Sequence, residues 1–270
     1  MPTIERDAIS IYFESTGKGR PVVFLHGWTM DHELWDRQVT AFAASYRCIT
    51  VDLRGHGSSS KPADGYGYEE HVEDLYHLLE ALDLRHATLV GSSMGGAIAI
   101  QLAAVHPERV AQVVTVGTPP QLVADDQWPE GRPLDVVGAF LEFQRVARER
   151  TMRQIVEDSA HADLGEATNA WLFQIALRTP SWAAIGSWKG ALASSAVPFI
   201  SRLAVPLLVI QGRHDAFVSS AAASRLAAKA PDSRLAWFEN SAHFPFLEEP
   251  ELFNGELAKF LDDWRGGSRR

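Results

Sequence analysis

Short, almost continuously apolar runs recur along the chain at wide intervals. They cover residues 8–13, 21–25, 47–51, 87–90, 111–116, 206–210 and 234–238. A strand with one face in water alternates apolar and polar residues, whereas a strand buried on both faces of a parallel sheet is apolar throughout. These runs therefore predict the strands of a mostly parallel sheet that is covered on both faces.

Helical patterns lie between the predicted strands. Residues 68–84 place Val72, Leu75, Leu79 and Leu82 on one stripe, and acidic residues occupy the first turns. Further helical patterns cover residues 97–110, 220–233 and 249–264. Because strands and helices alternate, the sequence predicts an α/β fold with right-handed crossover connections.

The alternation stops between about residues 120 and 200. Residues 133–160 and 166–196 have helical patterns, and no clear strand separates them. We therefore predict a core made of residues 1–119 and 201–270, with a helical cap at 120–200 inserted between two strands.

Composition narrows the class of protein. The chain has 270 residues, of which 46% are hydrophobic and 22% charged, as in one large globular α/β unit. The formal net charge of −9 argues against nucleic acid or an anionic membrane as a partner. Residues 1–10 are not expected to form a signal peptide, and no apolar run is long enough for a membrane span. With Cys48 as the single cysteine, the expected location is the reducing cytoplasm.

A glycine-rich corner joins a predicted strand to a predicted helix. Gly91-Ser92-Ser93-Met94-Gly95 matches the G-x-S-x-G pattern, with Ser93 at its centre. The pattern alone arises by chance in on the order of one chain in ten of this length. Its position after a strand and before a helix is what the pattern requires, because the nucleophile sits on a strained turn whose neighbours leave no room for a Cβ atom. Ser93 is therefore the predicted nucleophile.

A serine hydroxyl needs a general base, and the base needs an orienting acid. His243 follows the last predicted strand, and Asp215 follows the strand before it. Both therefore fall at the carboxyl edge of the sheet, where open α/β folds place their ligands. The order Ser93, Asp215, His243 is one of the known triad orders. The histidines in or beside helical patterns are expected to be solvated; they are His71, His77, His86 and His106.

The developing oxyanion of such a reaction needs two N–H donors. One is expected to be the backbone N–H of Met94, which follows the nucleophile at the start of a helix. The other is expected to be the backbone N–H of Trp28, in the loop after the predicted strand at 21–25. Gly27 lets this backbone come close, and His26 is expected to support the loop by hydrogen bonding.

No metal or cofactor is expected. His161 with Asp163, and His214 with Asp215, are candidate ligand pairs, but neither has a third ligand at a recognisable spacing. Cys48 lies within a predicted strand and is expected to be an inert, buried thiol.

Five segments together resemble the α/β-hydrolase superfamily: His26-Gly27, residues 52–59, 91–96, 212–215 and 242–250. The pattern is similar to esterases and to the cofactor-free haloperoxidase and perhydrolase group. The resemblance implies an eight-stranded sheet flanked by helices, with a helical cap after the sixth strand. It also implies a structural role for residues 52–59, with Asp52 and Arg54 as anchors.

The predicted function is a serine hydrolase that cleaves a carboxylic ester or lactone through an acyl-enzyme on Ser93. Aromatic residues of the predicted cap favour apolar acyl or aryl groups; they are Trp128, Phe140, Phe143, Trp171, Phe173, Trp182 and Trp188. Peracid formation and carbon–carbon bond hydrolysis on the same triad are alternatives, and Phe244 after His243 disfavours the latter. A non-catalytic receptor for a small ligand is the alternative of another class. The oligomeric state and the physiological substrate stay open.

Overall fold

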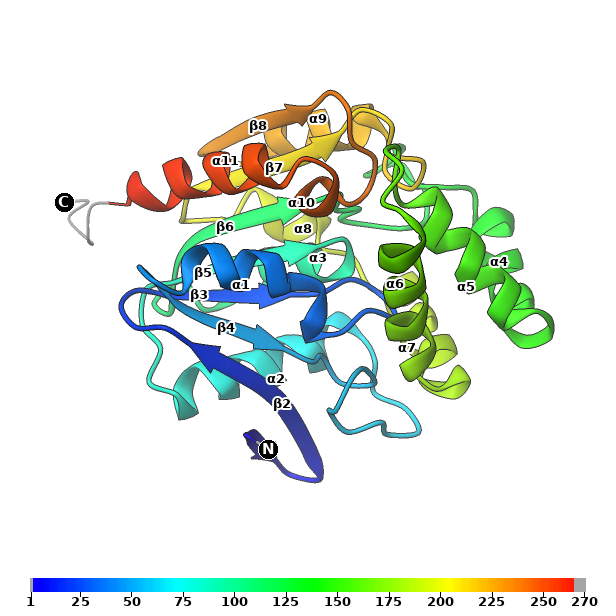
Figure 1. Ribbon diagram of the computed structural model, residues 1–270, viewed down its shortest axis with the longest axis horizontal. Coiled ribbons are helices and arrows are strands. Elements are labelled where there is room, and N and C mark those ends of the chain that lie inside the picture. Colours follow the sequence, from blue (N-terminus) through cyan, green and yellow to red (C-terminus); the bar gives the residue numbers. More distant parts are fainter. Residues whose placement is uncertain (1, 265–270) are drawn as a thin grey trace.

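The computed structural model of the protein describes residues 2–264, and an eight-stranded sheet runs through its centre (Figure 1). The strand order is β1-β2-β4-β3-β5-β6-β7-β8. The strands are β1 (Thr3–Arg6), β2 (Ile9–Thr16), β3 (Pro21–Leu25), β4 (Arg47–Val51), β5 (Ala87–Ser92), β6 (Val110–Val116), β7 (Leu207–Gly212) and β8 (Ser233–Phe238). Neighbouring strands from β4 to β8 in this order are parallel. The β1–β2 pair and the β2–β4 pair are antiparallel. The predicted α/β class and the eight strands are confirmed.

The central strands coincide closely with the apolar runs. The predicted boundaries of β3 and β4 are those of the structure, and β5 continues two residues beyond its prediction, to Ser92. Residues Val22–Leu25 and the whole of β5 are buried, as expected for strands covered on both faces. The edge strand β1 was not predicted, because its four residues TIER alternate between exposed and half-buried positions and form no apolar run.

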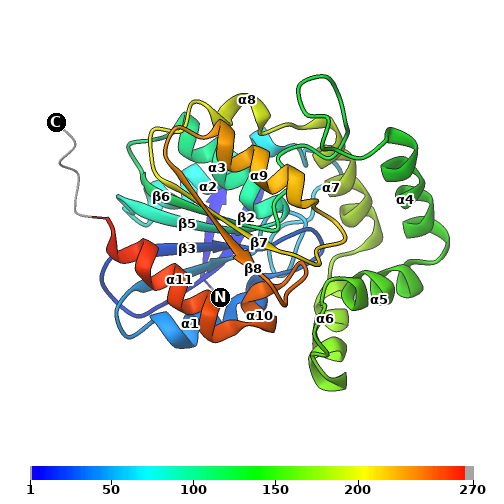
Figure 2. The same ribbon diagram turned by 90° about the horizontal axis from the view of Figure 1, so that it is seen from above.

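Helices cover both faces of the sheet (Figure 2). One face carries α2 (Tyr68–Ala81), α3 (Met94–Val105), α8 (Val197–Ile200) and α9 (Ser220–Lys229). The other carries α1 (Asp36–Phe42), which follows the short helix η1 (His32–Trp35), and the C-terminal pair α10 (Pro245–Glu248) and α11 (Pro250–Asp262). Each layer buries its own apolar cluster against the sheet. Cys48 lies in β4 and is buried, as predicted, and burial raises the pKa of its thiol to about 11.

The prediction that His71 is a solvated residue is wrong. Its side chain is fully buried on the inner face of α2, in line with Tyr68, Leu75 and Leu78. These positions are three or four residues apart, so they share the side of the helix that packs on α3. Burial lowers the pKa of His71 well below the ordinary histidine value, so the ring is neutral.

The long helical insertion lies between β6 and β7. It contains α4 (Leu134–Val146), α5 (Arg148–Asp158), α6 (Glu166–Arg178) and α7 (Ser181–Ala193), which we call the cap helices. They gather at the end of the molecule toward which β3, β4, β5 and β6 point (Figure 1). The division into a core and a cap with boundaries at 120 and 200 stays a prediction. Among the described residues, no helix is long and apolar enough to cross a bilayer.

Candidate active site

Ser93 occupies the turn between β5 and α3 with φ 51° and ψ −116°. This backbone conformation is strained for any residue with a side chain. The surrounding glycines make the turn sterically feasible. A Cβ atom would lie 2.4 Å from the Gly95 backbone if added to Gly91, and 2.6 Å from the His26 carbonyl oxygen if added to Gly95. Both contacts are too close for a real side chain, so the tight turn requires glycine at these positions.

Asp215 and His243 come from neighbouring loops at the carboxyl ends of β7 and β8. Asp215 Oδ2 lies 2.8 Å from His243 Nδ1. The carboxylate also accepts the backbone N–H groups of Phe217 and Val218 and a side-chain N–H of Gln211. Sequence order and strand position alone placed these two side chains together, and the structure joins them by a hydrogen bond.

The charge state of Asp215 follows from its surroundings. Burial alone would raise its pKa, because the side chain is fully shielded from solvent. The adjacent His243 and the hydrogen bonds from the backbone act in the opposite direction and prevail, so the pKa is lowered. Asp215 is therefore a carboxylate that accepts the Nδ1–H of His243, which leaves Nε2 as the proton-accepting nitrogen of the ring.

Two backbone N–H groups stand near Ser93. Met94 is the first residue of α3, where helix N–H groups have no partner within the helix. Trp28 follows Gly27, whose backbone passes so close to the turn that an added Cβ would lie 3.2 Å from Ser93 Cβ. His26 supports this loop as predicted: its Nε2 accepts the Leu53 backbone N–H at 3.0 Å. These contacts bring the Gly27 backbone close to Ser93, and the role of the Trp28 and Met94 N–H groups as oxyanion donors stays a prediction.

Residues 52–59 hold the neighbouring turn together. Asp52 is buried and accepts the backbone N–H of Ser58 at 2.6 Å. Arg54 forms a two-point ion pair with the buried Asp74. Both side chains serve as anchors within the fold, in agreement with the structural role predicted for this segment.

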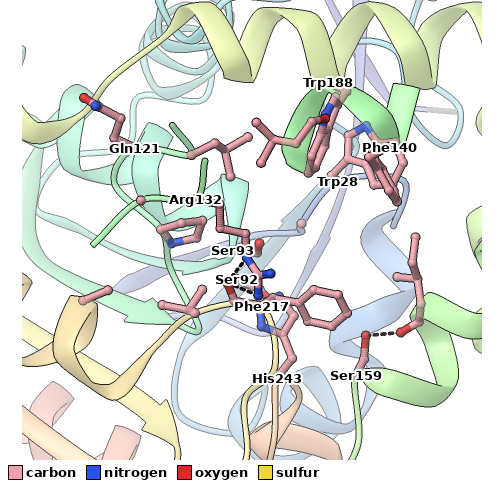
Figure 3. Close-up of a pocket in the computed structure, with 18 of the residues that line it drawn as sticks. Trp28, Ser92, Ser93, Gln121, Arg132, Phe140, Ser159, Trp188, Phe217 and His243 are labelled. Carbon is pink, nitrogen blue, oxygen red and sulfur yellow. Dashed lines mark hydrogen bonds between the residues drawn. The ribbon is translucent and has the colours of Figure 1, made fainter. Parts of the chain in front are cut away.

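Ser93 and His243 line one cavity of about 250 Å³ beneath the cap helices (Figure 3). Its walls include Trp28, Phe140 and Trp188, whose ring centroids are 4.6 to 5.2 Å apart. The indole N–H groups of Trp28 and Trp188 donate to backbone carbonyl oxygens of the cap, at 2.9 and 3.1 Å. The rings therefore present apolar surface to the cavity, which suits it to an apolar ligand.

The other cap aromatics divide between several environments. Trp128 also lines the cavity, whereas Phe143 and Trp182 are 55% and 59% exposed. Trp171 and Phe173 pack against the apolar cluster on the α1 and α11 side of the sheet. Aromatic composition indicated an apolar site but could not select the lining residues, because that choice depends on how the cap helices are rotated.

A charged cluster near η1 was not predicted from the sequence. Asp31, His32 and Asp52 offer oxygen and nitrogen atoms within 4.8 Å of one another. His32 Nδ1 lies 2.8 Å from Asp52, and Arg178 of α6 donates to Asp31 at 3.0 Å. Arg178 also pairs with Glu33, so the cluster ties a cap helix to the core. Asp31, His32 and Glu33 are consecutive, but Asp52 and Arg178 lie far from them in sequence, so no local pattern marks the cluster.

The Asp31→Asn variant is expected to be more stable than the wild type at pH 8. Burial and the charge of Asp52 raise the pKa of Asp31 from 3.8 to about 6, although Arg178 opposes this. The folded state therefore holds this proton more tightly than the unfolded state, and wild-type stability falls as pH rises from about 4 to 6. The expected gain is about 3 kcal/mol at pH 8, most of it lost near pH 4. Urea unfolding at both pH values measures it, and a gain independent of pH would contradict the ionisation of Asp31.

Comparisons with known proteins agree with this fold. Residues 20–250 match the family model of the alpha/beta hydrolase fold. The chain is 31% identical to a non-heme chloroperoxidase of Kitasatospora aureofaciens over 95% of this chain and 98% of that one. It is 32% identical to a pimeloyl-[acyl-carrier protein] methyl ester esterase of Nitrosomonas europaea, over 90% and 96% of the two chains. An esterase structure from Exiguobacterium antarcticum superposes with a TM-score of 0.92 at 29% identity, covering 95% and 97%.

The fold and the matches together define the class: the chain belongs to the α/β-hydrolase family. Esterases and non-heme haloperoxidases are among its relatives.

Proposed function

We propose that the protein is a serine hydrolase that cleaves carboxylic esters or lactones through an acyl-enzyme on Ser93. The observation that carries the proposal is that His243, which is hydrogen-bonded to Asp215, lines the same apolar cavity as a serine held on a strained turn. A relative named as a methyl ester esterase, 32% identical over 90% of the chain, supports the same chemistry.

In the proposed reaction, His243 Nε2 takes the proton of Ser93 as the hydroxyl oxygen attacks the ester carbonyl carbon. The carbonyl oxygen becomes negatively charged and accepts the N–H groups of Trp28 and Met94. His243 then gives its proton to the departing alcohol, and the acyl group stays on Ser93. Water, deprotonated by His243, hydrolyses this intermediate. Asp215 keeps the ring oriented and stabilises its charge throughout.

Hydrolysis of 4-nitrophenyl esters of increasing acyl length tests this proposal. The cavity is lined mainly by apolar side chains, so each buried methylene should add up to about 0.8 kcal/mol of binding. We expect kcat/KM to rise severalfold from acetate to butanoate or hexanoate, and to fall once the cavity is full. No turnover of any ester would contradict hydrolysis. A flat response, or a preference for the charged succinyl ester, would contradict the apolar acyl site.

Peracid formation is a second candidate, because a relative 31% identical to this chain is named as a non-heme chloroperoxidase. In that reaction hydrogen peroxide, rather than water, would attack the acyl group on Ser93. The residues involved are the same, so only the acceptor differs. Peroxide-dependent oxidation of bromide in acetate buffer is the distinguishing measurement.

A further inference from the structure

Gln211 is a buried polar side chain in a strand that is otherwise apolar. It precedes the last residue of β7, whose six residues LLVIQG are all buried, and its own exposed fraction is 1%. Glutamine is mostly found at the surface, because its amide must keep hydrogen-bond partners when it leaves water. A buried glutamine shortly before the loop that carries Asp215 therefore needs an explanation.

The amide nitrogen of Gln211 faces three acceptors at and after the end of β7. It donates to Asp215 Oδ2 at 2.9 Å, to the Val218 carbonyl oxygen at 3.2 Å and to the Gly212 carbonyl oxygen at 3.3 Å. Because all three neighbours are acceptors, the nitrogen and not the oxygen of the amide must point at them. One side chain thus joins the Asp215 carboxylate to the backbone on both sides of it.

Each oxygen of the Asp215 carboxylate has two donors. Oδ1 accepts the backbone N–H groups of Phe217 and Val218 at 2.8 and 3.1 Å. Oδ2 accepts the side-chain N–H of Gln211 and the Nδ1–H of His243. Gln211 and His243 therefore share one oxygen atom, and each draws on the same negative charge.

Within residues 2–264, the other groups around the pair have partners elsewhere. Gly117, after β6, comes so close that an added Cβ would lie 3.1 Å from Asp215 Oδ2, but its N–H donates to the Ile210 carbonyl oxygen. The titratable groups on the adjoining segments are also engaged. Glu248 and Glu249 accept the Ala242 N–H and the Ser241 hydroxyl, His214 stacks on His161, and Arg213 pairs with Glu239.

We propose that Gln211 is a positioning residue, which fixes the Asp215 carboxylate against His243 and sets the pH at which the pair becomes active. This inference rests on the proposed function. A donor to a carboxylate oxygen neutralises part of its charge. Without that donor, Oδ2 attracts the positively charged ring of His243 more strongly, so the ring keeps its second proton to a higher pH. A protonated ring cannot accept the Ser93 proton, so activity is then lost at a higher pH as the pH falls.

Gln211→Met removes the amide and keeps the length of the side chain. We expect the acid limb of kcat for 4-nitrophenyl butanoate to move upward by about 0.5 to 1 pH unit. On the alkaline plateau kcat should fall about 3- to 10-fold, because the carboxylate is held less firmly. KM should stay constant, because Gln211 lies outside the cavity lining. Gln211→Leu repeats the test with a second apolar side chain, so that one failure to fold does not decide it.

Gln112→Met is the matched control. Gln112 is also buried in a strand, β6, and its amide donates to the Phe260 carbonyl oxygen of α11 at 2.5 Å. Its substitution should lower the melting temperature, as that of Gln211 should, but it should leave the pH profile in place. Equal pH profiles of the wild type and the Gln211 variants would overturn the proposal, and so would the same shift in Gln112→Met.

An NMR titration of the His243 ring nitrogens separates this inference from the proposed function, because it needs no turnover. In Gln211→Met these nitrogens should titrate at a higher pH than in the wild type and in Gln112→Met. Titration at the same pH in all three proteins would overturn the role of Gln211, whatever the esterase assay shows. If the wild type hydrolysed no ester but the shift occurred, the serine hydrolase would be contradicted and the role of Gln211 supported.

Discussion

Ser93→Ala is expected to lower kcat for ester hydrolysis by about 10⁴- to 10⁶-fold, the loss seen when a triad nucleophile is removed. The His243–Asp215 pair and the apolar cavity remain in this variant, so KM should change little. A fluorophosphonate probe should label the wild type at Ser93 with one adduct per chain, and should leave the variant unlabelled. Intact-mass and peptide mass spectrometry locate the adduct.

Two further substitutions make this result specific. Ser224→Ala removes the hydroxyl of an exposed serine on α9 and should leave both rate and labelling unchanged. Ser93→Gly should be as inactive as Ser93→Ala. Its free energy of unfolding should exceed that of Ser93→Ala by about 1 to 3 kcal/mol, because φ 51° strains residues other than glycine. An adduct on Ser92, or residual turnover within tenfold of wild type, would show that Ser93 is not the nucleophile.

Asp215→Asn should reduce kcat by about 10³- to 10⁴-fold with little change in folding. The amide oxygen can still accept the N–H groups of Phe217 and Val218, but the amide nitrogen then faces His243 Nδ1 and can no longer accept the Gln211 side-chain N–H. For His243 Nδ1 to accept this amide N–H, the ring must carry its own proton on Nε2. The nitrogen that should deprotonate Ser93 would then be occupied.

Steady-state kinetics and NMR of the imidazole nitrogens check this expectation together. Glu239→Gln is a matched control, because Glu239 is exposed and pairs with Arg213 on the same edge of the molecule. It should keep its full rate. If Asp215→Asn kept more than a tenth of wild-type activity, another acid would have to orient His243.

The strands and the candidate triad could be predicted because each leaves a local signal. Strands buried on both faces must be apolar along their length, and the turn around Ser93 must contain glycine, so both are visible in a few consecutive residues. Asp215 and His243 follow from their positions after strands, since parallel strands end at one edge.

What the sequence could not predict depends on rotation and long-range contact. His71 lies on the inner face of α2. The apolar stripe that begins at Val72 had predicted that His71 would face solvent. The pairing of Arg178 with Asp31 joins residues separated by 147 positions. The Ser92 hydroxyl is buried without a hydrogen-bond partner within residues 2–264, which is recognisable only once the contacts of every nearby polar atom are known.

Trp28 has a consequence for any attempt to recombine this protein with its relatives. By sequence it belongs to the loop after β3, yet its indole N–H is bound by the Ala184 carbonyl of α7, and its ring packs on Phe140 and Trp188. In a chimera that exchanges α4–α7 alone, Trp28 would lose these partners. The backbone around Trp28, including its N–H group, would then be held less firmly. Substrate range and chemical rate would then change together. The unit that can be transplanted intact is the helical insertion plus position 28, so the useful crossover point lies in the loop after β3.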